Sequence, residues 1–339
     1  MTRTVVTLGE LMMRLKPAGK LRLRQASGFE LCHGGAEANV AISLAAFGLE
    51  SRFVSALPDH EIGTQALMAL RAAGVDTQHV ARRPGRMGLY FMEEGADYRS
   101  GCVIYDRADT SFTQLTPEDI DWDTVCQGAD WFHISGITPA IAPSTRDLAV
   151  AAVSAARQRG LHVSIDLNHR ERLWGYGEPA DSVMPALVAM ADTLIAGRGD
   201  CPACLGLEGD GENGTPDWAA SLYGRVLHAY PNLSHFALTI RNSSSADAHD
   251  WQAFLDTRDQ RVFSRTYSMT NVVDRVGTGD AFSAGLIYAL ITGQAPQDAV
   301  NFGAAANSLK HSIAGDANQV TAAEVSNLAA TTEFGRLRR

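Results

Sequence analysis

The amino-acid sequence predicts an α/β fold, with a mostly parallel central sheet and helices packed on both of its faces. Strand-like and helical runs alternate from residue 131 to residue 239, as they do when helices join successive parallel strands. Two other stretches, residues 11–32 and 88–105, instead alternate polar with apolar residues and contain turn-forming glycines. They predict antiparallel β-structure that would form a small second sheet, projecting from the main one as a lid.

The expected elements of the main sheet follow one another in a regular order. Strands at 5–9, 131–135, 162–166, 193–196 and 235–239 are accompanied by helices at 144–159, up to about Met190, and up to Leu227. A further strand begins at His249 as part of a hairpin, and a helix of small and apolar residues covers 280–290. Ligand sites in such sheets lie at the carboxyl ends of the strands.

Composition excludes several classes of protein. The 339 residues are 45% hydrophobic and 20% charged, which is typical of a globular chain, and the net charge of −9 comes without the basic stripe that nucleic-acid binding needs. No apolar run approaches the ~20 residues that span a bilayer, and the N-terminus lacks a secretory signal. We therefore expect a cytoplasmic protein with neither a nucleic-acid nor a membrane partner.

Five cysteines are scattered along the chain, an odd number that fits reduced thiols better than a disulfide framework. Cys201 and Cys204 form a lone C-x-x-C, which could be a redox pair or half of a zinc site. Because the other zinc ligands and a thioredoxin-like context are missing, we interpret both as incidental thiols.

The most informative segment begins at Asp274. Gly277-Thr278-Gly279 permits a tight turn that leads into a helix near Asp280. The N–H groups of such a turn meet at a helix N-terminus, where the helix dipole also stabilises an anion. The segment therefore predicts a phosphate site.

Asp280 lies in the first turn of that helix. A carboxylate there can accept the proton of an incoming hydroxyl while the backbone donors stabilise a transferred phosphoryl group. The other interpretation is an ordinary capping aspartate, and the short motif alone does not decide between the two.

A second glycine pair, Gly34-Gly35, leads into a helix whose apolar face contains Val40, Leu44 and Phe47. It either lets a ligand approach the backbone or serves only as a turn with close helix packing. The residues leave both readings open.

Together these segments resemble a known family. Gly34-Gly35 followed by Asn39-Val40-Ala41, and the later segment from Asp274, look like the two signature regions of the PfkB, or ribokinase-like, carbohydrate kinases. The resemblance runs from about residue 4 to residue 319. It is strongest to 2-keto-3-deoxygluconate kinases, through GLYF at 88–91, IYDR at 104–107, SGITP at 135–139 and DLNHR at 166–170.

The resemblance implies a ribokinase-like three-layer α/β/α domain at residues 1–330, with lid segments at about 11–33 and 86–108 and a tail at 331–339. It implies ATP and Mg²⁺ as cofactors and transfer of the γ-phosphoryl group to a sugar hydroxyl. By matching position, Asp280 is the catalytic base. The anion hole is formed by Gly277, Thr278 and Gly279, and the substrate side by Gly34, Gly35, Asn39, Tyr90, Tyr105, Arg107, Arg170 and, less closely, Asp316.

Side-chain chemistry agrees with a sugar acid. The planar fork of arginine matches a carboxylate, and Arg107 and Arg170 could converge on one, whereas a neutral ligand would leave two buried positive groups unpaired. The alternative for either arginine is a surface or intramolecular ion pair. Tyr90 and Tyr105 could meet a polyol or simply pack within the lid.

Two segments depart from the family pattern. Where many relatives carry Asn-x-x-Glu for Mg²⁺, this chain has GRGD at 197–200, and we expect Asp200 to contact the metal through water. Where many have a Lys-x-Gly turn, it has Arg241, which either binds nucleotide phosphates beside Gly277 and Gly279 or lies on a solvated loop.

We therefore expect ATP-dependent phosphorylation of 2-keto-3-deoxy-D-gluconate to its 6-phosphate, by a homo-oligomer that associates through its lid. The galactonate epimer is not excluded. The alternatives are a kinase of the same fold for fructose, ribose or a nucleoside, and a non-catalytic sugar or nucleotide sensor. A nicotinamide enzyme is disfavoured because the first βα turn lacks G-x-G-x-x-G.

Overall fold

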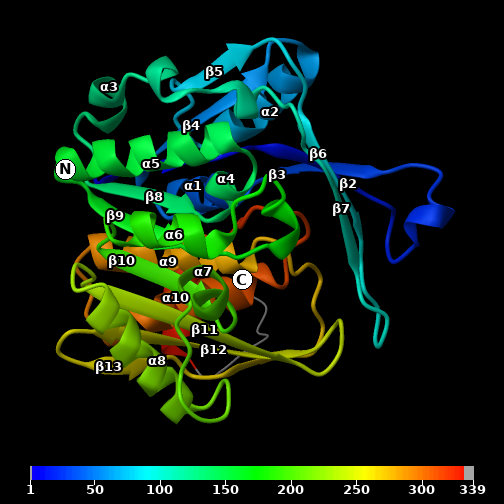
Figure 1. Cartoon of the computed structure of the whole chain (residues 1–339). Helices are drawn as coiled ribbons and strands as arrows, with labels where there is room; N and C mark the ends of the chain where they lie inside the picture. Colours follow the sequence, from blue (N-terminus) through cyan, green and yellow to red (C-terminus); the bar gives the residue numbers. More distant parts are fainter. Residues whose placement is uncertain (1, 332–339) are drawn as a thin grey trace.

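The computed structural model describes residues 2–331, and its main sheet dominates the molecule (Figure 1). The strands lie in the order β13-β12-β11-β10-β9-β8-β1-β4-β5, with β14 paired to β12. Neighbours from β11 to β5 are parallel, while β12, β13 and β14 pair antiparallel. The strands are β1 (Thr4–Leu8), β4 (Glu50–Pro58), β5 (Val80–Arg83), β8 (Trp131–Ser135), β9 (His162–Asp166), β10 (Thr193–Gly197), β11 (His235–Ser243), β12 (His249–Thr257), β13 (Arg261–Phe263) and β14 (Tyr267–Met269).

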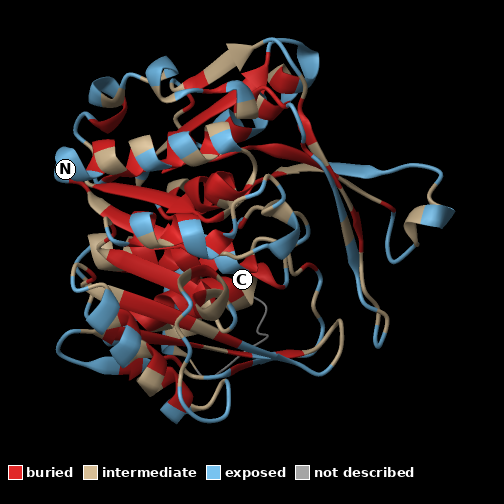
Figure 2. Cartoon of the chain, in the orientation of Figure 1, coloured by how far each residue is buried: buried red, intermediate tan, exposed pale blue. Residues whose placement is uncertain are grey.

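Helices cover both faces of this sheet, and the strands between them are buried (Figure 2). Alternate residues of β1 enter different cores: Val6 and Leu8 pack with helices of one face, and Val5 packs with helices of the other. The first face carries α3 (Trp122–Cys126), α5 (Pro143–Gln158), α6 (Ala180–Val188), α7 (Asp200–Leu205) and α8 (Pro216–Ala229), and the second carries α1 (Ala36–Ala46), α9 (Thr278–Ile291), α10 (Pro296–Lys310) and α11 (Ala322–Ala330). Two further helices are α2 (Glu61–Ala72) and α4 (Ile137–Ala140).

The three-layer prediction is confirmed, and several elements match closely. The strands expected at 131–135 and 162–166 are β8 and β9, and the hairpin expected at His249 is formed by β11 and β12. The helix expected from Asp280 begins two residues earlier, at Thr278, because Gly277 is its N-cap.

The second sheet has four strands in the order β3-β2-β6-β7, and we call it the lid sheet. It contains β2 (Met12–Lys16), β3 (Glu30–Gly34), β6 (Gly88–Glu93) and β7 (Cys102–Asp106). The pairs β2–β3 and β6–β7 are antiparallel, as expected, but β2 and β6 are parallel. The two predicted antiparallel stretches are thus confirmed as hairpins. The parallel pairing that joins them was not predicted; it arises because β2 and β6 leave the main sheet after β1 and β5, which run in the same direction.

The far end of the lid sheet contacts the turn between β11 and β12. Lys20 Nζ lies 2.7 Å from Asp247 Oδ1, and Asp247 Oδ2 accepts the N–H of Asp97 at 3.1 Å. The N–H of Ala246 donates to the carbonyl of Asp97 at 2.8 Å. These four residues, which we call the lid latch, join two loops of the lid sheet to the turn between β11 and β12.

Three further predictions concern membrane-spanning helices, the cysteines and the C-terminal tail. In the described part of the chain, no helix is long and apolar enough to span a bilayer. All five cysteines are free, and Cys201 and Cys204 are buried on α7. The tail expected at 331–339 lies outside the described residues except for Thr331.

Candidate active site

A cavity of about 980 Å³ lies between the carboxyl edge of the main sheet and the lid sheet. It occupies the place where parallel sheets bind their ligands. Every site residue expected from the sequence lines it. These are Gly34, Gly35, Asn39, Tyr90, Tyr105, Arg107, Arg170, Asp200, Arg241, Gly277, Thr278, Gly279, Asp280 and Asp316.

The glycine turn at the start of α9 is required by close packing. Gly277 has a φ of 75°, and a Cβ on it would lie 2.0 Å from the main-chain oxygen of Asp316. Thr278 begins the helix and its hydroxyl donates to the carbonyl of Arg275 at 3.0 Å. The first N–H groups of a helix have no intrahelical partner, so this turn can receive an anion.

Asp280 is only 8% exposed and lies in the first turn of α9. Burial raises the pKa of its carboxyl to about 7; the hydrogen bond from Asn39 Nδ2 to Oδ2 at 2.7 Å lowers it, and the charge of Glu37 raises it further. A carboxylate with a pKa near neutrality is well matched to proton transfer from a hydroxyl. Asn39, expected on the sugar side, thus holds the candidate base.

Two more carboxylates lie near Asp280. Burial, followed by the charges of Asp200 and Asp280, raises the pKa of Asp166 to about 8. Asp166 also accepts the Ser283 hydroxyl at 3.0 Å, and Asp200 accepts the N–H of Gly197 at 2.6 Å. The mutual repulsion of these carboxylates suits a nearby cation, although no described cluster of His, Cys, Asp or Glu could hold a metal ion by itself.

The two arginines of the expected carboxylate clamp differ in their surroundings. Arg107 is buried, and its Nε and Nη2 lie 2.9 and 2.7 Å from Glu10 Oε2. Arg170 is exposed, and its Nη1 donates to the carbonyl of His169 at 2.9 Å. The argument that a neutral sugar would strand two buried cations was therefore wrong, because one arginine is already paired and the other is solvated.

Positive charge also gathers on the nucleotide side of the cavity. Arg241 and Arg275 both line the cavity, and desolvation together with the charges of Arg275 and Arg170 lowers the pKa of Arg241. Arginines that repel one another in this way are well placed to bind a polyanion.

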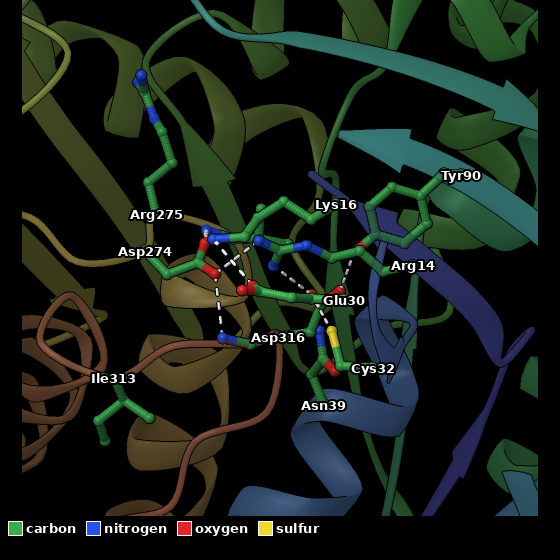
Figure 3. A network of polar contacts seen from close by, with 12 residues as sticks. Arg14, Lys16, Glu30, Cys32, Asn39, Tyr90, Asp274, Arg275, Ile313 and Asp316 are labelled. Atoms are coloured by element: carbon green, nitrogen blue, oxygen red, sulfur yellow. Dashed lines mark hydrogen bonds and ion pairs between the residues drawn. The ribbon is translucent and has the colours of Figure 1, made fainter. Parts of the chain in front are cut away.

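Tyr90 and Asp316, both expected to contact substrate, contact one another. The Tyr90 hydroxyl donates to Asp316 Oδ2, and Arg14 binds Asp316 Oδ1 at 2.8 Å and Asp274 Oδ2 at 2.7 Å (Figure 3). We call Arg14, Tyr90, Asp274 and Asp316 the Arg14 network. Tyr105 packs beside Tyr90 with ring centroids 6.0 Å apart.

Three buried charged residues of this region were missed in the sequence. Glu10 follows directly on the first strand, which was a usable signal for a residue at a carboxyl edge. Glu37 accepts from the Ser135 N–H, the Ser135 hydroxyl and the Thr138 hydroxyl at 2.8–2.9 Å. Arg14 gave no signal, since its carboxylate partners lie more than 250 positions away along the chain.

Comparison with known proteins agrees with this geometry. A solved structure of a 2-dehydro-3-deoxygluconokinase from Thermotoga maritima superposes with a TM-score of 0.92 at 38% identity, covering 97% of this chain and all of that one. A 2-dehydro-3-deoxygalactonokinase of Haloferax volcanii is 33% identical over 96% of each chain. A 5-dehydro-2-deoxygluconokinase of Shouchella clausii is 30% identical over 91% of this chain and 90% of its own. The model of the pfkB family carbohydrate kinases matches residues 2–322, and the chain belongs to that family.

Proposed function

We propose that this protein transfers the γ-phosphoryl group of ATP to the terminal hydroxyl of a 2-keto-3-deoxy sugar acid, with 2-keto-3-deoxy-D-gluconate yielding its 6-phosphate. The observation that carries the proposal is Asp280: a buried carboxylate with a pKa raised to about 7, in the first turn of a helix whose glycine turn can receive a phosphate. The similar Thermotoga maritima protein is named for this activity.

The proposed mechanism divides the cavity into two sides. The sugar acid would bind beneath the lid sheet, with its hydroxyl at Asp280, which takes the proton as the oxygen attacks the γ-phosphorus. The N–H groups at Gly277, Thr278 and Gly279 would stabilise the charge on the transferred group. The lid would exclude water, so that ATP is not hydrolysed without a sugar.

The nucleotide side would hold ATP through Arg241 and the glycine turn. Mg²⁺ would be bound mainly by phosphate and water, with Asp200 in its outer shell, which fits the repelling carboxylates around Asp166. When bound, the metal neutralises phosphate charge. We propose a cytoplasmic location because ATP is the proposed phosphoryl donor.

Recognition of the sugar acid would depend on the two arginines in unequal ways. Glu10 already binds two donors of Arg107, so Arg107 offers a fixed, partly neutralised edge to the cavity. Arg170 is exposed, and among the described residues it forms no ion pair, although its charge lowers the pKa of Asp166 and of Asp280. It would therefore provide most of the attraction for a substrate carboxylate.

A second candidate substrate is the galactonate epimer, 2-keto-3-deoxygalactonate. The Haloferax volcanii relative, which covers 96% of this chain, is named for phosphorylating that sugar acid. Both epimers carry the same carboxylate and terminal hydroxyl, so the residues proposed above would serve either one.

We also propose that two or more copies associate through their lid sheets. The outer strands β3 and β7 each have an unpaired edge, and Leu31 and Ile104 on them are exposed. Open strand edges with apolar side chains favour pairing with another chain. Light scattering coupled to size-exclusion chromatography tests this; a monomer at micromolar concentration contradicts it.

The test of function is ADP release from ATP·Mg²⁺ with both keto-deoxy acids, gluconate, fructose, ribose and adenosine. Turnover confined to the keto-deoxy acids, with KM raised at least about tenfold in Arg170→Ala, is the expected result. Turnover on a neutral sugar would retain Asp280 as base and reject the carboxylate clamp. Ligand binding without turnover across the panel would indicate a sensor.

A further inference from the structure

One row of side chains crosses the lid sheet and ends on a single carboxylate. Arg14 on β2 is in register with Cys32 on β3 and Tyr90 on β6, so the three side chains share one face of the sheet. All three contact Asp316: Arg14 Nη1 and Cys32 Sγ lie 2.8 and 3.7 Å from Oδ1, and the Tyr90 hydroxyl donates to Oδ2 (Figure 3). The lid is thereby joined to a loop of the main domain.

The second carboxylate of the Arg14 network controls the turn before α9. Asp274 Oδ1 accepts the N–H of Val276 at 3.0 Å, and Oδ2 accepts both the N–H of Gly315 at 3.0 Å and Arg14 Nη2. Val276 also packs against the buried lid cluster that includes Tyr90. The Arg14 guanidinium therefore links lid strand β2 to Asp274, which holds the turn before α9.

The contact of Arg14 with Asp274 and Asp316 also balances the negative charge of these two carboxylates. The side chains of Arg14, Asp274 and Asp316 are each at most 2% exposed, so the carboxylates would repel a phosphate bound at the neighbouring turn unless they were offset. Among the described residues, Arg14 is the cation in direct contact with both. Buried Lys310 lies farther off and donates to the carbonyl of Ile313 at 3.0 Å.

We propose that Arg14 is a positioning residue for phosphoryl transfer, which ties the lid to the turn of Gly277 through Asp274 and Asp316 and offsets their charge. The inference rests on the function proposed above. Asp280 belongs to the helix that this turn begins, so releasing the turn would displace the base relative to the phosphate. A displacement of about 1 Å can cost roughly 10²-fold in rate.

The experiment compares Arg14→Met and Arg14→Lys with Arg22→Met as matched control. Arg22 also lies on the lid and binds a carboxylate, that of Glu93 at 3.2 Å, but its contact does not reach the turn. We expect Arg14→Met to lower kcat about 10²-fold while KM for the sugar acid changes less than about tenfold. The kcat of Arg14→Lys should lie between those of the wild type and Arg14→Met, because lysine keeps the positive charge but lacks the planar guanidinium that binds both carboxylates.

A second readout separates positioning from general destabilisation. The ratio of ADP released to sugar phosphate formed should stay near one in the wild type and in Arg22→Met. In Arg14→Met it should rise severalfold, because a lid released from the turn admits water to the phosphoryl group. The double variant Arg14→Met/Asp274→Asn removes one of the two unpaired charges and does not restore the tether. Its melting temperature should therefore recover in part while the ratio stays high.

Each outcome decides the question. A folded Arg14→Met protein with the kcat and ratio of Arg22→Met overturns the inference. If Arg14→Met does not fold, Arg14→Lys and the double variant are judged by the same two readouts, and wild-type values in either overturn it. A wild type that forms no sugar phosphate contradicts the proposed function, and the inference with it; an active wild type with an active Arg14→Met contradicts the inference alone.

Discussion

The carboxyl of Asp280 serves chemistry at the expense of the fold. A raised pKa means that the folded state holds this proton more tightly than the unfolded state, so stability falls as pH rises from about 4 to about 7, where the carboxyl ionises. The charge that the reaction needs is therefore present only where it destabilises the protein.

Asp280→Asn should accordingly lose activity and gain stability. We expect kcat to fall by about 10²–10⁴-fold and the melting temperature at pH 8 to rise, because the amide is neutral and still accepts from Asn39. Steady-state kinetics and thermal unfolding of both proteins at pH 8 measure this. Normal turnover would contradict the assignment of Asp280 as the base. A lower melting temperature would contradict the claim that the buried charge of Asp280 destabilises the fold at pH 8.

The pH dependence of turnover follows from the same group. If Asp280 must be ionised, kcat with saturating substrates should be constant above about pH 7 and fall as pH decreases below it, since the pKa is raised to about 7. Rates from pH 5.5 to 9 provide the measurement. A rate that stays level down to pH 5.5 would mean that another group takes the proton.

Glu10 supports recognition through Arg107. Glu10→Gln keeps an acceptor but removes the charge, so Arg107 should become free to change rotamer and the KM for the sugar acid should rise about 10-fold or more. Asp106→Asn is the matched control, because Asp106 pairs with Arg86 on the exposed side of the lid. Equal KM values in the two variants would show that Glu10 does not hold Arg107 for binding.

At the level of elements, the turn before α9 allows little variation. Gly277→Ala should cost at least about 2 kcal/mol of unfolding free energy, because φ is positive and a Cβ would meet the carbonyl of Asp316. Gly279→Ala provides the contrast, since a Cβ there would meet nothing within 4 Å and alanine favours the helix. Urea unfolding of the two variants should therefore shift in opposite directions.

The elements were predictable wherever one local rule applied. The strands β8 and β9 are short apolar runs between helices, and α9 follows a glycine turn, so local sequence located them within two residues. The parallel pairing of β2 with β6 was not predictable in this way, because it depends on the direction in which β1 and β5 leave the main sheet.

At the level of the whole molecule, the site also contains residues that local sequence could predict and residues that it could not. The site residues predicted from family-like motifs all line one cavity, whereas Glu10, Arg14 and Glu37 act through partners distant in sequence. A buried ion pair leaves no local pattern: each half is simply a charged residue in an otherwise apolar segment. The environment of Arg107 could not be anticipated for this reason.

The lid latch predicts how the molecule behaves as a unit. Asp247→Ala removes the acceptor for Lys20 and for the N–H of Asp97, and since the pair is partly exposed it should change stability by less than about 1 kcal/mol. The lid end should nevertheless open more often, so trypsin should cleave faster at Arg99. Unchanged cleavage with an unchanged melting temperature would show that the latch does not restrain the lid.

The parallel centre of the lid sheet also bears on how the chain is made. On the ribosome, the hairpin of β2 and β3 is synthesised well before β6, the strand that pairs with β2. Until then Met12 and the apolar residues beside it lack their cover, and nascent chains are exposed to misassembly in that interval. The lid sheet is thus completed only after β6, more than 70 residues beyond β2, has been synthesised.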